Sequence, residues 1–237
     1  MPNLFPIILS IAIVCIGGTT ATARIKKEAP PIKIITLGDS ITTGVRPGVK
    51  PEETFATLLQ ESLKKEGINA EVVNVGIGGE NTAQCLRRLR DEVIDKKPAF
   101  VTIMYGANDS YVDKGKTAPR LTEDEFRANL AKIVDDLRKA GIVPILMTSN
   151  RLGDKHPNNG AGEHPGKRLE AYAKICREVA KEAKVPLVDH FEFWTKTNAD
   201  GVDIDRWMTD SCHPNVRGHQ EMAKLMLPVI LRTIRGK

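Results

Sequence analysis

Three side chains far apart in the sequence, Ser40, Asp210 and His213, are of the types that catalyse acyl transfer. A serine hydroxyl becomes a nucleophile when a base accepts its proton, and an imidazole base needs a carboxylate that fixes its tautomer. Asp210 and His213 are three residues apart, so one turn of chain can place the carboxylate against Nδ1 of the ring. Nε2 would then face Ser40. The three residues are therefore candidates for nucleophile, base and orienting acid.

Acyl transfer also needs hydrogen-bond donors for the negative charge that develops on the carbonyl oxygen. Donors of suitable type are the backbone N–H groups of Ser40 and Gly79 and the side-chain amide of Asn108. Each of these residues follows an apolar segment that is typical of a buried strand. The three groups are therefore candidates for an oxyanion hole.

The elements that would position these residues alternate between strand and helix patterns. Short apolar runs predict strands at residues 32–37, 71–75, 100–105, 142–147 and 185–188. Amphipathic spacing predicts helices at 54–66, 81–96, 167–183 and 216–234, and another between a capping box at 122–125 and Gly141. Pro228 is expected to kink the last helix.

This alternation predicts an α/β fold, a flavodoxin-like three-layer α/β/α sandwich around a five-stranded parallel sheet. Ligands of such sheets bind beyond the carboxyl ends of the strands. If the first strand lies between the second and the third, Ser40, Gly79 and Asn108 converge on one rim. The longest segment without predicted structure, residues 151–166, is also expected to be functional, because long loops inside compact domains seldom lack a role.

The first 23 residues differ from the rest because they contain no Lys, Arg, Asp or Glu. Residues 4–16 form an apolar run, and residues 21–23, Ala-Thr-Ala, match a signal-peptidase site. Thirteen helical residues span about 20 Å, less than the ~30 Å hydrocarbon core of a bilayer. The sequence therefore predicts a signal peptide at 1–23, one domain at 24–237, and a secreted or periplasmic location. An uncleaved membrane anchor is the alternative, since no basic residue precedes the apolar run.

The charged residues are spread along the chain. The 35 basic and 30 acidic residues give a formal net charge of +5 without a basic cluster. Nucleic-acid-binding proteins concentrate positive charge on one helix or patch. The composition therefore indicates a soluble domain with no nucleic-acid partner.

Cysteines and histidines give no sign of a metal or cofactor site. Cys85, Cys176 and Cys212 follow the predicted signal peptide, and an odd number permits at most one disulfide. We expect all three to be buried small apolar residues. The remaining histidines lack the spacing of metal ligands; they are His156, His164, His190 and His219.

Each candidate also has a purely structural interpretation. Ser40 could cap a turn, Asn108 could form an Asx turn, and Asp210 and His213 could cap a helix. The glycine-rich residues 76–79 could cradle a phosphate, but no GK[ST] follows them. It is the joint presence of nucleophile, base and donors that favours a hydrolase.

Five further side chains have open roles. Asp39 is expected to organise the loop as a hydrogen-bond acceptor. His156 and His164 could line the rim. Trp194 and Trp207 could form a platform for the substrate or belong to the core.

Four segments, in order, resemble the four sequence blocks of the SGNH, or GDSL-type, esterase/lipase family: GDSIT (38–42), GIGGEN (76–81), YGAND (105–109) and DSCHPN (210–215). They extend over most of the predicted domain. Two departures are mild: Ile41 stands where the name-giving leucine would, and Glu80 follows Gly79 where several relatives carry aspartate.

The resemblance implies that Ser40 is the nucleophile, His213 the base and Asp210 its partner. It also implies an oxyanion hole made of the Ser40 amide, Gly79 and Asn108.

The leading hypothesis is an exported serine esterase that forms an acyl-enzyme and needs no cofactor. The expected substrates are short-acyl, chiefly acetyl, esters of carbohydrates or similar polar molecules. A lysophospholipase or thioesterase of the same family is the alternative. A non-enzymatic flavodoxin-like module that binds a polar ligand at the same rim is the hypothesis from another class.

Overall fold

The structure is a computed structural model of the chain, and it describes residues 29–236. The predicted signal peptide at residues 1–23 lies outside this range. From Pro31 onward the chain forms one compact unit. No helix among residues 29–236 is long and apolar enough to cross a membrane.

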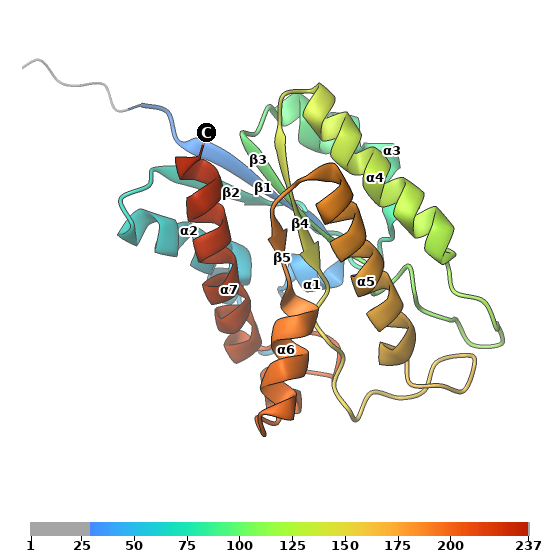
Figure 1. Cartoon of the computed structure of the whole chain (residues 1–237). Coiled ribbons are helices and arrows are strands. Elements are labelled where there is room, and N and C mark those ends of the chain that lie inside the picture. Colours follow the sequence, from blue (N-terminus) through green and yellow to red (C-terminus); the bar gives the residue numbers. More distant parts are fainter. Residues whose placement is uncertain (1–28, 237) are drawn as a thin grey trace, which may run out of the picture. The chain divides into compact units, whose positions relative to one another are not determined.

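A parallel sheet forms the centre of this unit (Figure 1). Its five strands run in the order β2-β1-β3-β4-β5, which confirms the predicted fold class and places the first strand between the second and third. Alternate residues of each strand face opposite sides, so Ile34 packs into one core and Ile35 into the other. The strand bounds are Ile32–Gly38 for β1, Ala70–Asn74 for β2, Phe100–Tyr105 for β3, Val143–Thr148 for β4 and Leu187–Val188 for β5.

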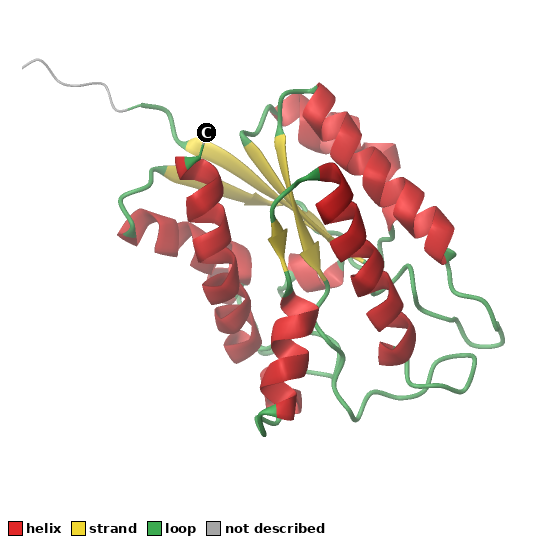
Figure 2. Ribbon diagram, in the orientation of Figure 1, coloured by secondary structure: helices red, strands yellow, loops and turns green. Residues whose placement is uncertain are grey.

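Helices cover both faces of the sheet (Figure 2). On one face lie α3 (Thr82–Arg88), α4 (Glu123–Lys139) and α5 (Gly166–Ala183). On the other face α2 (Phe55–Lys65) packs against α7 (Val216–Arg235). Each core therefore lies between the sheet and one helical layer.

The predicted helix boundaries hold best where a chemical signal marks them. The capping box before α4 is present: Thr122 Oγ1 accepts from the Glu125 backbone N–H at 3.2 Å, and Glu125 accepts from the Thr122 N–H at 2.7 Å. Pro228 lies inside α7, which continues beyond it to Arg235.

One predicted helix differs in type along its length, and one helix was not predicted. The chain is helical over the predicted residues 81–96, but only its first part, α3, is an α-helix, and α3 ends at Arg88. A π turn and a 3₁₀ turn follow, up to Lys96. A further helix, α6 (His190–Ala199), was not predicted. Its Phe191 and Trp194 are buried, but its aromatic and threonine-rich sequence carries little helical periodicity.

Candidate active site

Ser40 is placed by a tight turn at the end of β1. The Asp39 side chain accepts from the Ile41 N–H at 2.9 Å and caps the short helix α1 (Ser40–Thr43), so Ser40 is the first helical residue. Gly38 permits this turn, because a Cβ there would lie 2.1 Å from Oγ1 of Thr42 and 2.6 Å from the carbonyl oxygen of Met104. The loop-organising role expected for Asp39 is therefore present.

The structure brings Ser40, His213 and Asp210 into one chain of contacts. Ser40 Oγ and His213 Nε2 are 2.8 Å apart, and His213 Nδ1 lies 2.9 and 2.8 Å from the two Asp210 carboxylate oxygens. Asp210 also accepts from the backbone N–H groups of Cys212 and His213, at 3.2 and 2.8 Å. With Nδ1 donating to Asp210, the lone pair of Nε2 is left to accept the serine proton.

The surroundings of His213 favour its neutral form. Burial lowers the pKa of His213, the nearby charge of Arg46 lowers it further, and Asp210 opposes both. Burial acts to raise the pKa of Asp210, but its hydrogen bonds from His213 and Cys212 outweigh burial and hold that pKa below the ordinary range. Arg46 also donates to Asp210 Oδ2 at 3.3 Å. The pair can therefore accept a proton at neutral pH, with the acid ionised and the base neutral.

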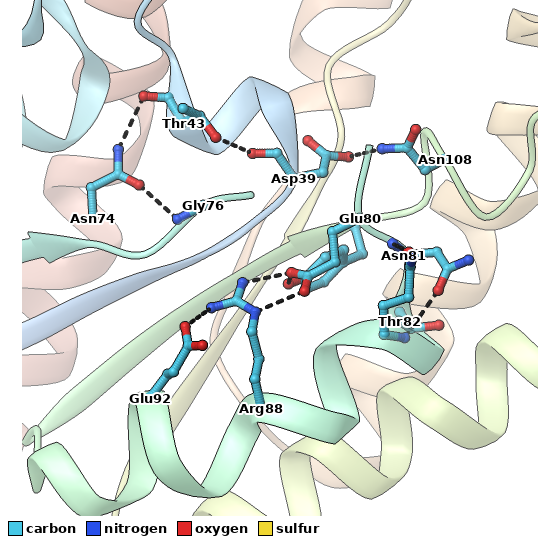
Figure 3. Close-up of polar contacts among 12 residues, drawn as sticks. Asp39, Thr43, Asn74, Gly76, Glu80, Asn81, Thr82, Arg88, Glu92 and Asn108 are labelled. Carbon is cyan, nitrogen blue, oxygen red and sulfur yellow. Dashed lines mark hydrogen bonds and ion pairs between the residues drawn. The ribbon is translucent and has the colours of Figure 1, made fainter. Parts of the chain in front are cut away.

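Gly79 comes from the loop that joins β2 to α3. Its φ of 78° is in the left-handed region, and a Cβ added there would meet nothing within 4 Å, so its backbone faces open space. The next residue, Glu80, is buried and fixes the loop from behind: Arg88 donates to it from Nε at 2.7 Å and from Nη2 at 2.5 Å (Figure 3). The Tyr105 hydroxyl donates to the same carboxylate at 2.6 Å.

Asn108 completes the rim after β3. Its Nδ2 donates to Asp39 Oδ2, a contact that is drawn in Figure 3. The two atoms are 3.2 Å apart. The following residue, Asp109, is buried and accepts from the N–H and hydroxyl of Thr82 at 2.9 and 2.6 Å. Thr82 begins α3, so this contact joins the end of β3 to the loop that carries Gly79.

These residues surround an open cleft of about 650 Å³. Ser40, Gly79, Asn108, Asp210 and His213 all line it. The five residues predicted from the sequence to form the site therefore lie at one cleft. The other lining residues are Arg46, Ala107, Tyr111, Arg120, Leu152, His156 and Cys212.

The structure gives different locations to the histidines and tryptophans whose roles the sequence left open. His156 and Leu152 bring the long loop after β4 to the cleft, whereas His164 Nε2 contacts the Gly153 carbonyl at 3.0 Å and does not line the cleft. Trp194 and Trp207 are buried edge to face, with ring centroids 5.3 Å apart, so they belong to the core and form no platform.

The cysteines follow the prediction only in part. Cys85 and Cys176 are buried residues with free thiols, whereas Cys212, beside His213, is a residue of intermediate exposure that packs against a small apolar cluster. The prediction of three buried cysteines is therefore met by two, and Cys212 departs from it only in the partial exposure of the residue, which lies on the loop that carries the base. Over residues 29–236 no group of three or more His, Cys, Asp or Glu is arranged to hold a metal ion.

Four cleft residues were not found from the sequence: Arg46, Tyr111, Arg120 and Leu152. Arg46 follows Ser40 by six residues, and Arg120 lies in the loop between β3 and α4. Single arginines in loops are common at protein surfaces, so neither carried a signal before the loops were placed.

Comparison with known proteins shows to which family the chain is similar. Residues 36–221 match the model of the GDSL-like Lipase/Acylhydrolase family. Among curated proteins, Esterase TesA of Pseudomonas aeruginosa is 29% identical over 91% of this chain and 96% of its own. The uncharacterized lipoprotein YqeF of Bacillus subtilis is 32% identical over 71% of this chain and 73% of its own.

A third relative, the thioesterase 1/protease 1/lysophospholipase L1 of Escherichia coli, is 30% identical over 83% of this chain and 84% of its own. Among solved structures, that of the acetyl xylan esterase AlAXEase superposes with a TM-score of 0.71 at 28% identity. The superposition covers 84% of this chain and 100% of the AlAXEase chain.

Proposed function

The chain belongs to the GDSL-like lipase/acylhydrolase family and is a carboxylic ester hydrolase, and on that premise we propose that Ser40, His213 and Asp210 are its catalytic triad. The observation that carries this proposal is the continuous contact from Ser40 Oγ through His213 to Asp210. A module that only binds a ligand has no need of this arrangement, and family membership removes that hypothesis.

In the proposed reaction Ser40 Oγ attacks the ester carbonyl carbon while Nε2 of His213 takes the hydroxyl proton. The carbonyl oxygen becomes an oxyanion, which accepts hydrogen bonds from the N–H groups of Ser40 and Gly79 and from Nδ2 of Asn108. The intermediate collapses, the imidazolium donates its proton to the leaving alcohol, and an acyl-serine remains. Water, deprotonated by His213, then releases the acid and restores Ser40.

We propose short-acyl esters of polar alcohols, such as acetylated sugars, as substrates. The cleft is open, and its lining includes the charged or polar side chains of Arg46, His156 and Asp210. Such a lining suits a hydroxyl-rich leaving group better than a long acyl chain. The similarity to an acetyl xylan esterase points the same way.

A thioesterase or lysophospholipase is the second candidate, because Ala107, Tyr111 and Leu152 give part of the cleft an apolar wall. The E. coli relative carries both activities in its name.

The expected export is part of the proposal. The uncharged first 23 residues and the relative named as a lipoprotein support it. We expect protein recovered outside the cytoplasm to begin at residue 24, and its intact mass measures this directly. A mass that retains residues 1–23 would favour the uncleaved anchor.

The test of the enzymatic proposal is hydrolysis of p-nitrophenyl acetate, butyrate and octanoate, an acetylated xylo-oligosaccharide and a lysophospholipid. We expect kcat/KM to fall with acyl length, and Ser40→Ala to lose all measurable turnover. Equal turnover by Ser40→Ala would contradict the triad. A preference for octanoate or the lysophospholipid would leave the triad intact and replace the substrate class.

A further inference from the structure

The side-chain amide of Asn108 is held from both of its ends. Arg120 Nη1 donates to Asn108 Oδ1 at 2.9 Å, and Asn108 Nδ2 donates to Asp39 Oδ2 at 3.2 Å. One N–H of Nδ2 is used in this way, and no hydrogen bond of the described residues occupies the other. The two neighbours thus determine which end of the amide is available to a ligand in the cleft.

Arg120 is itself held in place. Its Nε and Nη2 form a two-pronged contact with the Asp113 carboxylate, at 3.0 and 2.8 Å, and its guanidinium lies 5.2 Å from the Tyr111 ring centroid. Its backbone N–H donates to the Tyr111 carbonyl at 3.0 Å, which closes the base of this loop. Asp113 and Tyr111 therefore position the guanidinium so that Nη1 points to Asn108.

The segment of residues 151–166 supports this loop from outside. The Gly160 N–H donates to the Val112 carbonyl at 2.9 Å. A Cβ at Gly160 would lie 1.9 Å from the Asp113 carbonyl oxygen, so only glycine fits at this approach. The arginine therefore lies within a packed arrangement of two loops.

We propose that Arg120 is a positioning residue, which fixes the Asn108 amide with Nδ2 toward the developing oxyanion. A flipped amide would set its N–H groups against the Arg120 guanidinium, which has no acceptor, so Arg120 opposes the flip whatever the state of Asp39. Asp39 opposes the flip only when it is ionised, because burial raises the pKa of its carboxyl to about 7. The flipped amide would also present an acceptor to the oxyanion. The charge of Arg120 on Oδ1 further polarises the amide and strengthens Nδ2–H as a donor. The inference rests on the proposed role of Asn108.

The test compares Arg120→Met with a matched control, Arg127→Met. Arg127 has a similar exposure, 36% against 33%, and pairs with Glu178 and Glu182 away from the cleft. With p-nitrophenyl acetate we expect Arg120→Met to lower kcat roughly 10-fold with KM nearly unchanged, because the lost contact acts only in the transition state. The control should retain full kcat.

Arg120→Lys should recover only part of the loss, since one ammonium cannot bind Asp113 and Asn108 together. Asp113→Asn keeps the guanidinium but weakens its fork, and it serves as the second variant if Arg120→Met does not fold. We expect a smaller fall in kcat from it. A rise in KM at constant kcat would overturn the proposal, because Arg120 would then contact the substrate instead.

A double-mutant cycle separates this inference from the proposed function. We expect Asn108→Ala to lower kcat by roughly 10²–10³. Arg120→Met should then have almost no effect in the Asn108→Ala background, because its effect passes through the amide. Equal losses in both backgrounds would overturn the role of Arg120 and leave the oxyanion hole standing. An Asn108→Ala variant with full kcat would instead refute the oxyanion role itself.

Discussion

The two sides of the cleft hold their carboxylates in opposite ways. On the side of the base, the Asp210 side chain is 51% exposed, and most of its contacts are to residues two and three positions along the chain. On the oxyanion side, Glu80 and Asp109 are buried, and their partners Arg88, Tyr105 and Thr82 come from other elements.

This difference predicts that mutations on the two sides of the cleft affect activity and stability differently. The Asp210–His213 segment is a local motif on a loop, so changing it removes little that the core depends on. The buried carboxylates join strand ends to helix α3, so changing them leaves uncompensated polar groups inside the fold. We therefore expect mutations on the base side to lower activity alone, and mutations on the oxyanion side to lower both activity and stability.

Within this comparison, the largest expected effect is that of Asp210→Asn. The amide cannot fix the tautomer of His213 in the same way, so kcat should fall by roughly 10³–10⁴. The melting temperature should stay close to that of the wild type, because the side chain is half exposed. Thermal unfolding and esterase assays on the same preparation measure both. A clear loss of stability with Asp210→Asn would break the comparison.

Glu80→Ala should show the opposite pattern. It leaves the Arg88 guanidinium, only 10% exposed, without its main partner, which costs about 3 kcal/mol of unfolding free energy and roughly 10 °C of melting temperature. Activity should fall less than with Asp210→Asn. Lys139→Met, which removes an exposed ion pair with Asp135 on α4, is the control and should leave the melting temperature close to that of the wild type. Equal melting temperatures for the two variants would show that the buried contacts of Glu80 stabilise the fold no more than an exposed ion pair does.

The smallest expected effect is a shift in the pH profile. The base must be neutral, so kcat/KM should rise with pH to a plateau, with its midpoint below the ordinary histidine pKa of 6.5 because burial and Arg46 lower the pKa of His213. Arg46→Met removes a positive charge and should move the midpoint upward. A midpoint that stays fixed or moves downward would show that Arg46 does not act on the base.

The sequence predicted this arrangement best where chemistry and strand ends coincide. Ser40, Gly79 and Asn108 each follow an apolar strand, and β1 lies between β2 and β3, so the topology alone brings them to one rim. Asp210 and His213 were predictable as a pair because their contact is local.

Contacts between loops could not be predicted in this way. Arg46 reaches Asp210 across 164 positions, and Arg120 reaches Asn108 from the far end of an irregular loop. No periodicity governs such segments, and an arginine in a loop is ordinarily a solvated charge. Helix α6 was missed for a related reason: its burial comes from Phe191 and Trp194 rather than from a regular apolar stripe.

We propose above all that Ser40 is the residue that becomes acylated. Treatment with diethyl p-nitrophenyl phosphate, followed by intact-mass and peptide mass spectrometry, tests it without any assumption about the natural substrate. We expect one diethylphosphoryl group per chain, located on Ser40, with much slower labelling of His213→Ala and none of Ser40→Ala. A stoichiometric adduct on another residue, or equal labelling of Ser40→Ala, would contradict the account.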